Sequence, residues 1–194
     1  MSVLKQIKSK VTYAKIGHLY SASQFKDMGP RSSVYKALSR LEAQGLLVRV
    51  GHGLYTKVDK TSQYKVLPGA EDVVRQLARQ LGGRKQGRVQ PHGAEVARRL
   101  GLCTQMPLRP QFEGNVGQQT LHLGRLVVKL KPAVRAVRPL LGSPAGEALS
   151  ALLFLGKQQV TPQTIARVKG QLSEEQFDSL RRHAVKPWLT RMLE

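Results

Sequence analysis

The side chains that could catalyse a reaction or hold a metal are few and widely spaced in this 194-residue sequence. The histidines at 18, 52, 92, 122 and 183 fall in separate predicted elements, and none has a metal-ligand spacing to another. Cys103 is the only cysteine, which excludes an internal disulfide, and no base is placed to activate its thiol. The 12 acidic residues include no pair spaced for general acid–base chemistry. We therefore expect no enzyme, no metal site and no cofactor.

Positive charge is the feature that does indicate a partner. The chain has 32 Lys and Arg against 12 Asp and Glu, a formal net charge of +20, which favours a polyanion such as nucleic acid or an anionic membrane surface. Its longest apolar stretches, such as "ALSALLFLG", are far shorter than the roughly 20 residues of a bilayer span. The start "MSVLKQIKSK" lacks the apolar core of a signal peptide. We expect a soluble cytoplasmic protein without a membrane partner.

The residues best suited to bind phosphates and read bases lie between positions 31 and 57. In "RSSVYKALSRL" the apolar residues recur at helical spacing, so the basic and hydroxyl side chains between them are predicted to face outward. Arginine and lysine on such a helix can reach base edges, whereas short hydroxyls and helix N-terminal amides can approach phosphates. The alternative is a merely solvated helix face. The predicted DNA-binding residues are Arg31, Ser32, Ser33, Tyr35, Lys36, Ser39, Arg40, His52 and Lys57.

The elements that would position these residues form an N-terminal domain, predicted over 1–60. A helix over "VLKQIKSKVTYA" is followed by a short extended piece, and Ser21 or Ser23 then caps a second helix that Gly29 ends. The third helix, with the apolar stripe Val34, Ala37, Leu38 and Leu41, stops at Gly45. The strands "LLVRV" and "LYTKV" turn at Gly51–Gly53.

This order of elements predicts a winged helix-turn-helix. Its third helix would enter the major groove and its hairpin would be the wing, where His52 donates to a phosphate. The rings of Tyr35 and Tyr55 have an alternative interpretation as cover for the core, which we favour for Tyr55.

A second domain is predicted over 61–194, and its sheet part covers about 70–131. After a helix over "EDVVRQLARQLGG", the segment "GAEVARRLGL" looks like the first helix of another helix-turn-helix. Pro107 and Pro110 would lie inside the helix that should follow, where each costs roughly 3 kcal/mol. We therefore predict an edge strand at "LRPQFEG" and a hairpin that turns near Gly124. The result would be a small antiparallel sheet with helices.

The remainder, about 133–194, is predicted to be a helical bundle. Ser143 and Thr161 are followed by proline at the first helical position, and Ser173 is followed by two glutamates, all of which are typical of helix starts. A final short helix begins at Pro187 and carries Trp188. The fold class that we expect for the whole chain is α+β.

Three stretches carry a resemblance to a known family. "ALSRLEAQGLLVRVGHGLYTK", "VQPHGAEVARRLGLCTQMP" and "LHLGRLVVKLKPA", followed by a helical tail, resemble the AbiEi-type antitoxins of type IV toxin–antitoxin systems and a related family of short winged-helix proteins. The resemblance implies a bacterial repressor that binds repeats in its own promoter through the N-terminal domain. It also implies a partner toxin that resembles a nucleotidyltransferase.

Two functions from different classes are therefore open. The first is a sequence-specific DNA-binding autorepressor with an antitoxin role. The second is a protein- or RNA-interaction module that uses the winged helix as a contact surface and has no promoter role. Pairing of two chains through the helical tail would engage two half-sites at once, so a homodimer is an open alternative to a monomer.

Overall fold

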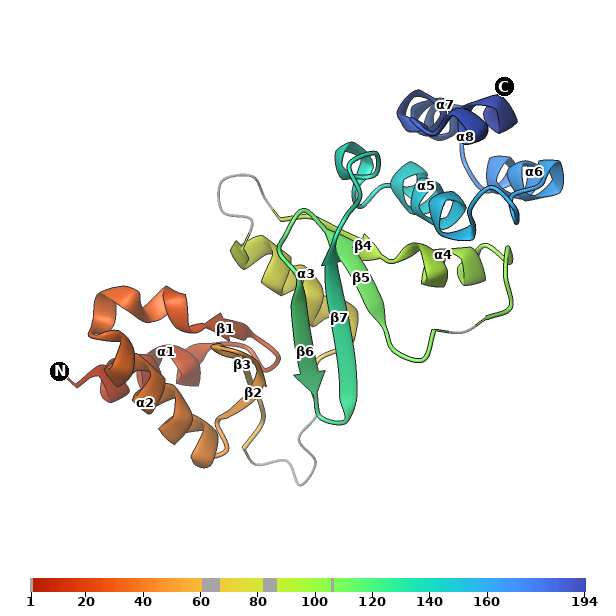
Figure 1. Ribbon diagram of the computed structural model, residues 1–194. Helices are drawn as coiled ribbons and strands as arrows, with labels where there is room; N and C mark the ends of the chain where they lie inside the picture. The colour runs from red at the N-terminus through yellow and green to blue at the C-terminus, as the bar shows by residue number, and fades with distance from the viewer. Residues whose placement is uncertain (1, 61–66, 82–86, 106) are drawn as a thin grey trace. The chain divides into compact units, whose positions relative to one another are not determined.

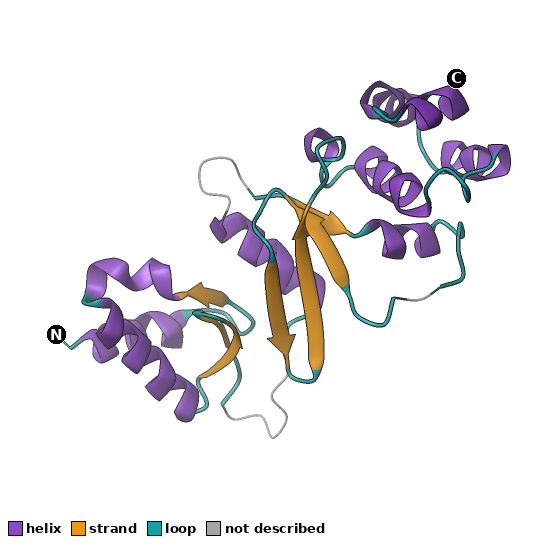
Figure 2. Ribbon diagram, in the orientation of Figure 1, coloured by secondary structure: helices purple, strands orange, loops and turns teal. Residues whose placement is uncertain are grey.

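The computed structural model describes residues 2–60, 67–81, 87–105 and 107–194 and has an α+β fold with two small sheets (Figures 1 and 2). The chain divides into two compact units. The first comprises Met1–Gln80 with Thr120–Val128, and the second comprises Leu81–Gln119 with Lys129–Glu194. The domain boundary that the sequence suggests at residue 60 stays a prediction.

The first unit combines helices with a three-stranded antiparallel sheet of strand order β1-β3-β2. Local signals set the ends of its elements: Ser21 caps η1 in a capping box with Gln24, and Gly45, at φ +72°, follows α2. Ser21, not Ser23, is thus the cap, and the second predicted helix is a 3₁₀-helix. The elements are α1 (Val3–Tyr13), β1 (Leu19–Ser21), η1 (Ala22–Met28), α2 (Arg31–Ala43), β2 (Leu47–Gly51), β3 (Leu54–Lys57) and α3 (Ala70–Leu81).

A hydrophobic core holds α1, η1 and α2 on this sheet. The predicted stripe of α2 is buried in full, and Ile7, Val11 and Phe25 pack against it from α1 and η1. Tyr55 belongs to the same cluster and is 2% exposed, which confirms its predicted core role.

Helix α3 is bound to the open edge of strand β1 by two glutamines. Gln76 accepts a hydrogen bond from the Leu19 amide at 3.0 Å and donates to the Gly17 carbonyl at 3.1 Å. Gln80 donates to the Leu19 carbonyl at 2.6 Å. These side chains satisfy backbone groups that an edge strand would otherwise leave open. A fragment that keeps α3 is therefore a better minimal unit than residues 1–60.

The second sheet is mixed, with strand order β4-β5-β7-β6, and not antiparallel as predicted. Strand β5 pairs antiparallel with β4 and parallel with β7, so it is an internal strand and the edge-strand prediction is wrong. The three-residue strand β4 was not predicted from the sequence; Pro91 at its end suits an edge position. The strands are β4 (Val89–Pro91), β5 (Gln111–Gly114), β6 (Gln119–Leu123) and β7 (Leu126–Pro132).

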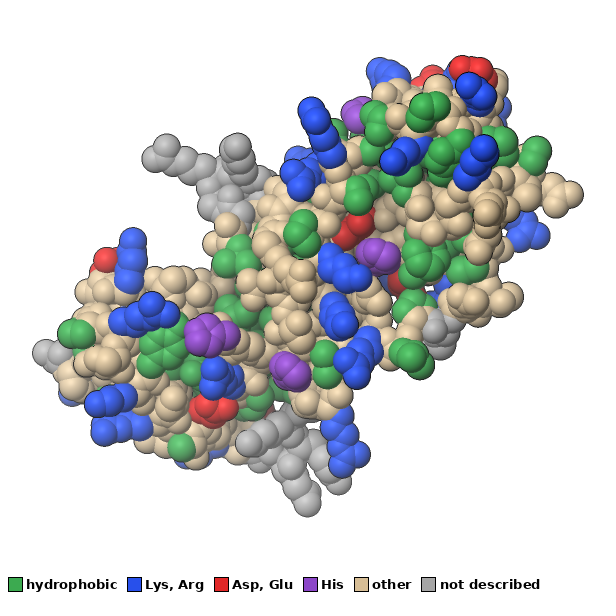
Figure 3. Space-filling model, viewed as in Figure 1, with side chains coloured by type: hydrophobic (Ala, Val, Ile, Leu, Met, Phe, Trp, Pro, Cys, Tyr) green, Lys and Arg blue, Asp and Glu red, His purple; other side chains and the backbone are tan. Residues whose placement is uncertain are grey.

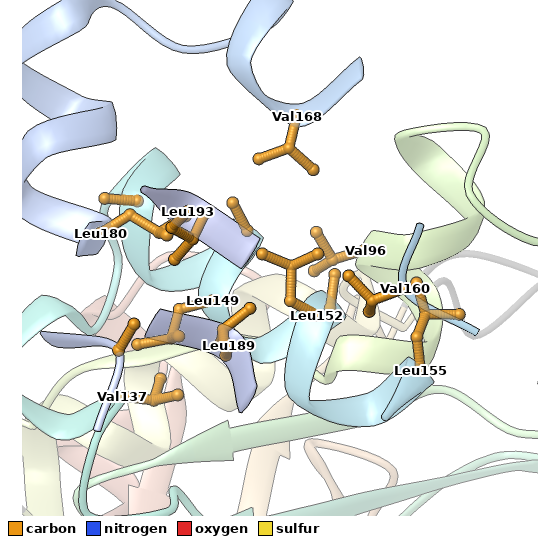
Figure 4. Packing of buried hydrophobic residues seen from close by; sticks show 14 of the residues in the cluster. Val96, Val137, Leu149, Leu152, Leu155, Val160, Val168, Leu180, Leu189 and Leu193 are labelled. Atoms are coloured by element: carbon orange, nitrogen blue, oxygen red, sulfur yellow. The ribbon is translucent and has the colours of Figure 1, made fainter. Parts of the chain in front are cut away.

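The second unit has a helical core centred on α5, which packs against α4 and α7 (Figure 4). The predicted caps Ser143, Thr161 and Ser173 are all confirmed by side-chain hydrogen bonds to backbone amides. The described residues between 100 and 110 contain no helix, in agreement with the argument from Pro107 and Pro110. The helices are α4 (Gly93–Arg99), η3 (Arg138–Leu140), α5 (Pro144–Leu155), α6 (Pro162–Gly170), α7 (Glu174–His183) and α8 (Pro187–Leu193).

Within the residues that the structure describes, none of the helices combines the length and the apolar character needed to cross a membrane.

Candidate nucleic-acid interface

Helix α2 presents most of the predicted binding residues on one side. The buried positions 34, 37, 38 and 41 leave two neighbouring rows at four-residue spacing, which are 31, 35 and 39, and 32, 36 and 40. In these rows only Tyr35 is half-buried; the other five side chains are exposed, and Ser33 beside them is half-buried. None of the described acidic residues forms an ion pair with Lys36 or Arg40. The basic side chains of α2 are therefore free to meet a ligand.

Tyr35 links this helix to the turn between β2 and β3. The Arg31 guanidinium lies over the Tyr35 ring, 5.5 Å from its centroid, and the centroid of the His52 ring lies 6.3 Å from that of Tyr35. Stacking on an aromatic face fixes an arginine in one orientation. The fold thus joins Arg31, Tyr35 and His52, which are 21 residues apart at the extremes, into one surface.

The turn itself is tightly held. Gly53 adopts φ +64°, its carbonyl accepts from the Ala22 amide at 2.8 Å, and an added Cβ would lie 3.0 Å from the Tyr35 hydroxyl oxygen. A left-handed conformation and a close neighbour both favour glycine at this position. The hairpin turn is consequently anchored to η1 and α2, so that His52 has a defined place beside α2.

Two further residues of this surface were not predicted from the sequence. Ser23 and Lys26 of η1 line, with Gly29, Arg31 and Tyr35, a hollow of about 380 Å³ beside the start of α2. Lys26 is exposed and adds a positive charge next to Arg31. No motif marks these residues, because only the packing of η1 on α2 brings them to the hollow. In Figure 3, Lys and Arg side chains are spread over the visible face of the first unit.

Lys57, the remaining predicted contact, has a structural role. Its Nζ donates to the carbonyls of Thr12 at 2.7 Å and Ala14 at 2.6 Å, at the end of α1. A cation that satisfies the last carbonyls of a helix also interacts favourably with the helix dipole. The Lys57 ammonium is thus engaged by the end of α1.

Replacing Lys57 with methionine should lower the free energy of unfolding by about 1–2 kcal/mol, because two carbonyls at the end of α1 lose a charged donor. Urea unfolding would measure the loss, with Lys60→Met as a control that removes an exposed charge nearby. DNA affinity of the folded variant should stay within about twofold of the wild type, since a single exposed phosphate contact would cost more. Unchanged stability together with weaker DNA binding would restore Lys57 as a phosphate contact.

Helix α4, the start of the false helix-turn-helix, uses its own charges internally. Glu95 forms ion pairs with Arg98 at 2.8 Å and with Arg99 at 3.0 Å. The hydrogen bond from Arg98 lowers the pKa of Glu95, so the carboxylate stays ionised near neutral pH. The two arginines are thus partly neutralised, unlike the basic residues of α2.

The motif "QPHG" at the start of α4 contains a glutamine, Gln90, that joins several elements by hydrogen bonds. Gln90 is 2% exposed; its amide donates to Glu113 at 2.8 Å and to the Gly146 carbonyl at 3.0 Å, and its oxygen accepts from the Gly142 amide at 3.0 Å. One side chain therefore connects β4, β5 and the start of α5. Buried polar groups are stable only when they are paired in this way.

His92 makes the stability of this region depend on pH. Its Nδ1 accepts from the Ala94 amide at 3.4 Å and caps α4. Burial lowers the pKa of His92 below its ordinary value of 6.5, with Lys131 acting in the same direction and Glu113 opposing it. The unfolded chain therefore binds this proton first as the pH falls, so the free energy of unfolding should decrease as the pH drops through 6.5.

The measurement is urea unfolding at about pH 8 and about pH 6, where an ordinary histidine changes its charge. His92→Asn, which keeps a helix-capping oxygen but does not titrate, should lose less stability over that interval than the wild type. Equal losses would assign the pH dependence to other groups.

In the rest of the described chain, the side chains that could bind a metal do not form a cluster. The described residues contain no group of three or more His, Cys, Asp or Glu side chains that could hold a metal ion. Cys103 is half-buried in the loop after α4, and its Sγ lies 4.0 Å from the Gln105 carbonyl oxygen. The surface of α2 and the hairpin turn is accordingly the best candidate site.

Comparison with known proteins gives a family but no activity. The model of a family described as "Family of unknown function (DUF6088)" matches residues 6–180. A search of the curated proteins finds no match.

Proposed function

Since the chain belongs to the DUF6088 family, whose function is unknown, its role has to come from the site, and we propose that it is a sequence-specific repressor that binds double-stranded DNA. The proposal assigns the order α1, β1, η1, α2, β2, β3 to a winged helix-turn-helix. In this assignment α2 enters the major groove, and the β2–β3 hairpin is the wing.

The observation that carries the proposal is the exposed side of α2, where Arg31, Lys36 and Arg40 have no acidic partner among the described residues. A helix with unpaired basic side chains on one face and a buried apolar stripe on the other is suited to the major groove. Ser32 and Ser39, between them, add short donors and acceptors that fit close to bases or phosphates.

The hairpin supports the same proposal. His52 is exposed in the turn, and its ring neighbours Tyr35 of α2, so a duplex lying on α2 would pass close to the turn. A histidine there can donate to a phosphate, which positions the protein on DNA without selecting a sequence. We therefore assign base reading to α2 and positioning to His52.

The resemblance to AbiEi-type antitoxins extends the proposal. It adds binding to repeats in the chain's own promoter, a cytoplasmic location and the control of a nucleotidyltransferase-like toxin. The test is co-expression with the product of the adjacent gene, where the full chain should relieve a growth defect. A fragment of residues 1–81 should not, if the surface that counters the toxin lies in the second unit.

The experiment that tests the central proposal is a pair of titrations of the full chain, one with the duplex upstream of its own gene and one with a random duplex of equal length. Each is run at about 50 and about 200 mM salt. Tighter binding of the upstream duplex at both salt concentrations supports a sequence-specific repressor. Equal binding of the two duplexes, or stronger binding of RNA or of an acidic protein, would favour the interaction module instead.

A further inference from the structure

Strand β7 has one side exposed to solvent where it runs through the second unit, at Lys129 and Lys131. From Val128 to Lys131 the residues of β7 alternate: Val128 and Leu130 are buried, whereas Lys129 and Lys131 are exposed. Alternation of this kind is typical of a sheet with one face on the core and one in solvent. Figure 3 looks onto β7 and shows a row of Lys and Arg side chains over it.

The neighbouring strand leaves this face without an accessible negative charge. In the parallel register Gln111 lies beside Lys129, and Glu113 lies beside Lys131. Glu113 is the only acidic residue in the four strands, all of which the structure describes, and it is 4% exposed. Its carboxylate accepts from Gln90 at 2.8 Å. The charged side chains on the solvent side of β7 are therefore all cations.

The two lysines are not explained by the structure of the sheet. Lysine is common on edge strands because it discourages strand pairing between molecules, but β7 lies between β5 and β6. Lysine is also depleted in strands in general. Within the described part of the chain, neither Lys129 nor Lys131 has an ion-pair partner. Two unpaired cations two residues apart on an internal strand thus call for a ligand.

We propose that Lys129 and Lys131 form a second phosphate-binding surface, which holds the backbone of duplex DNA and reads no bases. The inference rests on the proposed function. Charge complementarity selects the ligand, because two lysines on one face with a buried acid match a polyanion. Phe112 is the only Phe, Tyr or Trp in the four strands and it is 6% exposed, so this face presents no large aromatic ring on which single-stranded bases could stack, which favours a duplex. Contacts of this kind add affinity and do not select a sequence.

The test is the double substitution Lys129→Gln and Lys131→Gln in the full chain. If each lysine binds one phosphate, the slope of log K against log salt should become shallower by about 1.8, because each contact contributes about −0.9. The ratio of wild-type to variant affinity for DNA should therefore fall roughly tenfold between about 50 and about 200 mM salt. The upstream duplex and a random duplex should lose affinity by the same factor.

The matched control is Lys157→Gln with Lys186→Gln, which removes two exposed lysines from the helical part of the same unit. An unchanged slope for this control supports a local surface on β7. An equal change in both double variants would overturn the proposal, since net charge alone would then explain it. A loss confined to the upstream duplex would overturn it as well, because it would indicate base reading.

The outcomes separate this inference from the proposed function. If the wild-type chain prefers the upstream duplex and the Lys129/Lys131 variant has an unchanged slope, the phosphate-binding surface on β7 is ruled out and the repressor function stands. If the wild-type chain binds both duplexes equally and the variant has a shallower slope, the sequence-specific repressor is ruled out and the phosphate-binding surface on β7 stands. A wild-type chain that binds no duplex overturns both. Urea unfolding of the variant confirms that the comparison is made on folded protein.

Discussion

Replacing Lys36 and Arg40 together with alanine is expected to lower the affinity for the specific duplex by at least about tenfold. Each good base contact contributes roughly 1–3 kcal/mol, and 1.4 kcal/mol is a factor of ten. Both side chains are exposed on α2, and alanine is a good helix former, so the fold should be retained. The measurement is a titration with the upstream duplex, accompanied by one with a random duplex.

The difference in affinity between the upstream and the random duplex shows whether α2 contacts bases. Affinity for the random duplex should fall much less than affinity for the upstream duplex, because base contacts are lost only in the specific complex. The control is Lys157→Ala with Arg191→Ala, which removes one lysine and one arginine that are exposed in the second unit. Retained specificity in a folded Lys36/Arg40 variant would show that α2 does not read the sequence.

Gly93→Ala is expected to cause a large loss of stability in the second unit. An added Cβ would lie 2.2 Å from the Ser150 carbonyl oxygen, 2.7 Å from its carbonyl carbon and 2.9 Å from Phe154 Cβ. Two of these are backbone atoms of α5, which cannot rotate away as a side-chain tip would. Overpacking in a core typically costs about 1–3 kcal/mol, and we expect the upper part of that range or more.

The control for this prediction is Gly170→Ala at the end of α6, where an added Cβ meets nothing within 4 Å. There alanine should be neutral or stabilising by up to about 1 kcal/mol, because it restricts the unfolded chain. Urea unfolding of both variants would give the comparison. Similar midpoints for the two would mean that α4 and α5 can separate without cost, which contradicts the packing of α4 on α5.

The consequence of Gly93 for function would be indirect. The first unit has its own core and its own sheet, so a moderately destabilised Gly93→Ala variant should retain base reading by α2 in the molecules that remain folded. The close approach of α4 to α5 also means that one face of α4 is unavailable to a ligand. Val96 and Ala97 of α4 are 2% and 0% exposed, so this face of the helix is occupied by the core.

Much of the fold follows from local signals in the sequence. The stripe Val34, Ala37, Leu38 and Leu41 predicted which side of α2 is buried, because helical periodicity places those residues on one face. Helix ends were predicted where a hydroxyl side chain or a glycine satisfies or redirects the backbone, as at Ser143 and Gly45. The position of the hairpin turn was predicted for the same reason.

Tertiary structure alone decided the features that depend on residues far apart in the chain. The Lys57 ammonium reaches the carbonyls of residues 12 and 14, and no spacing in the sequence predicts a hydrogen bond across more than 40 residues. Strand β5 pairs parallel with β7, and not with β6, which follows it in the chain, so sequence order does not give the strand order. That order places Lys129 beside Gln111 and Lys131 beside the buried Glu113. The sequence by itself thus determined the elements and their buried faces, since these follow from backbone periodicity and capping. The three-dimensional packing determined which cations bind the protein itself and which remain free for a partner.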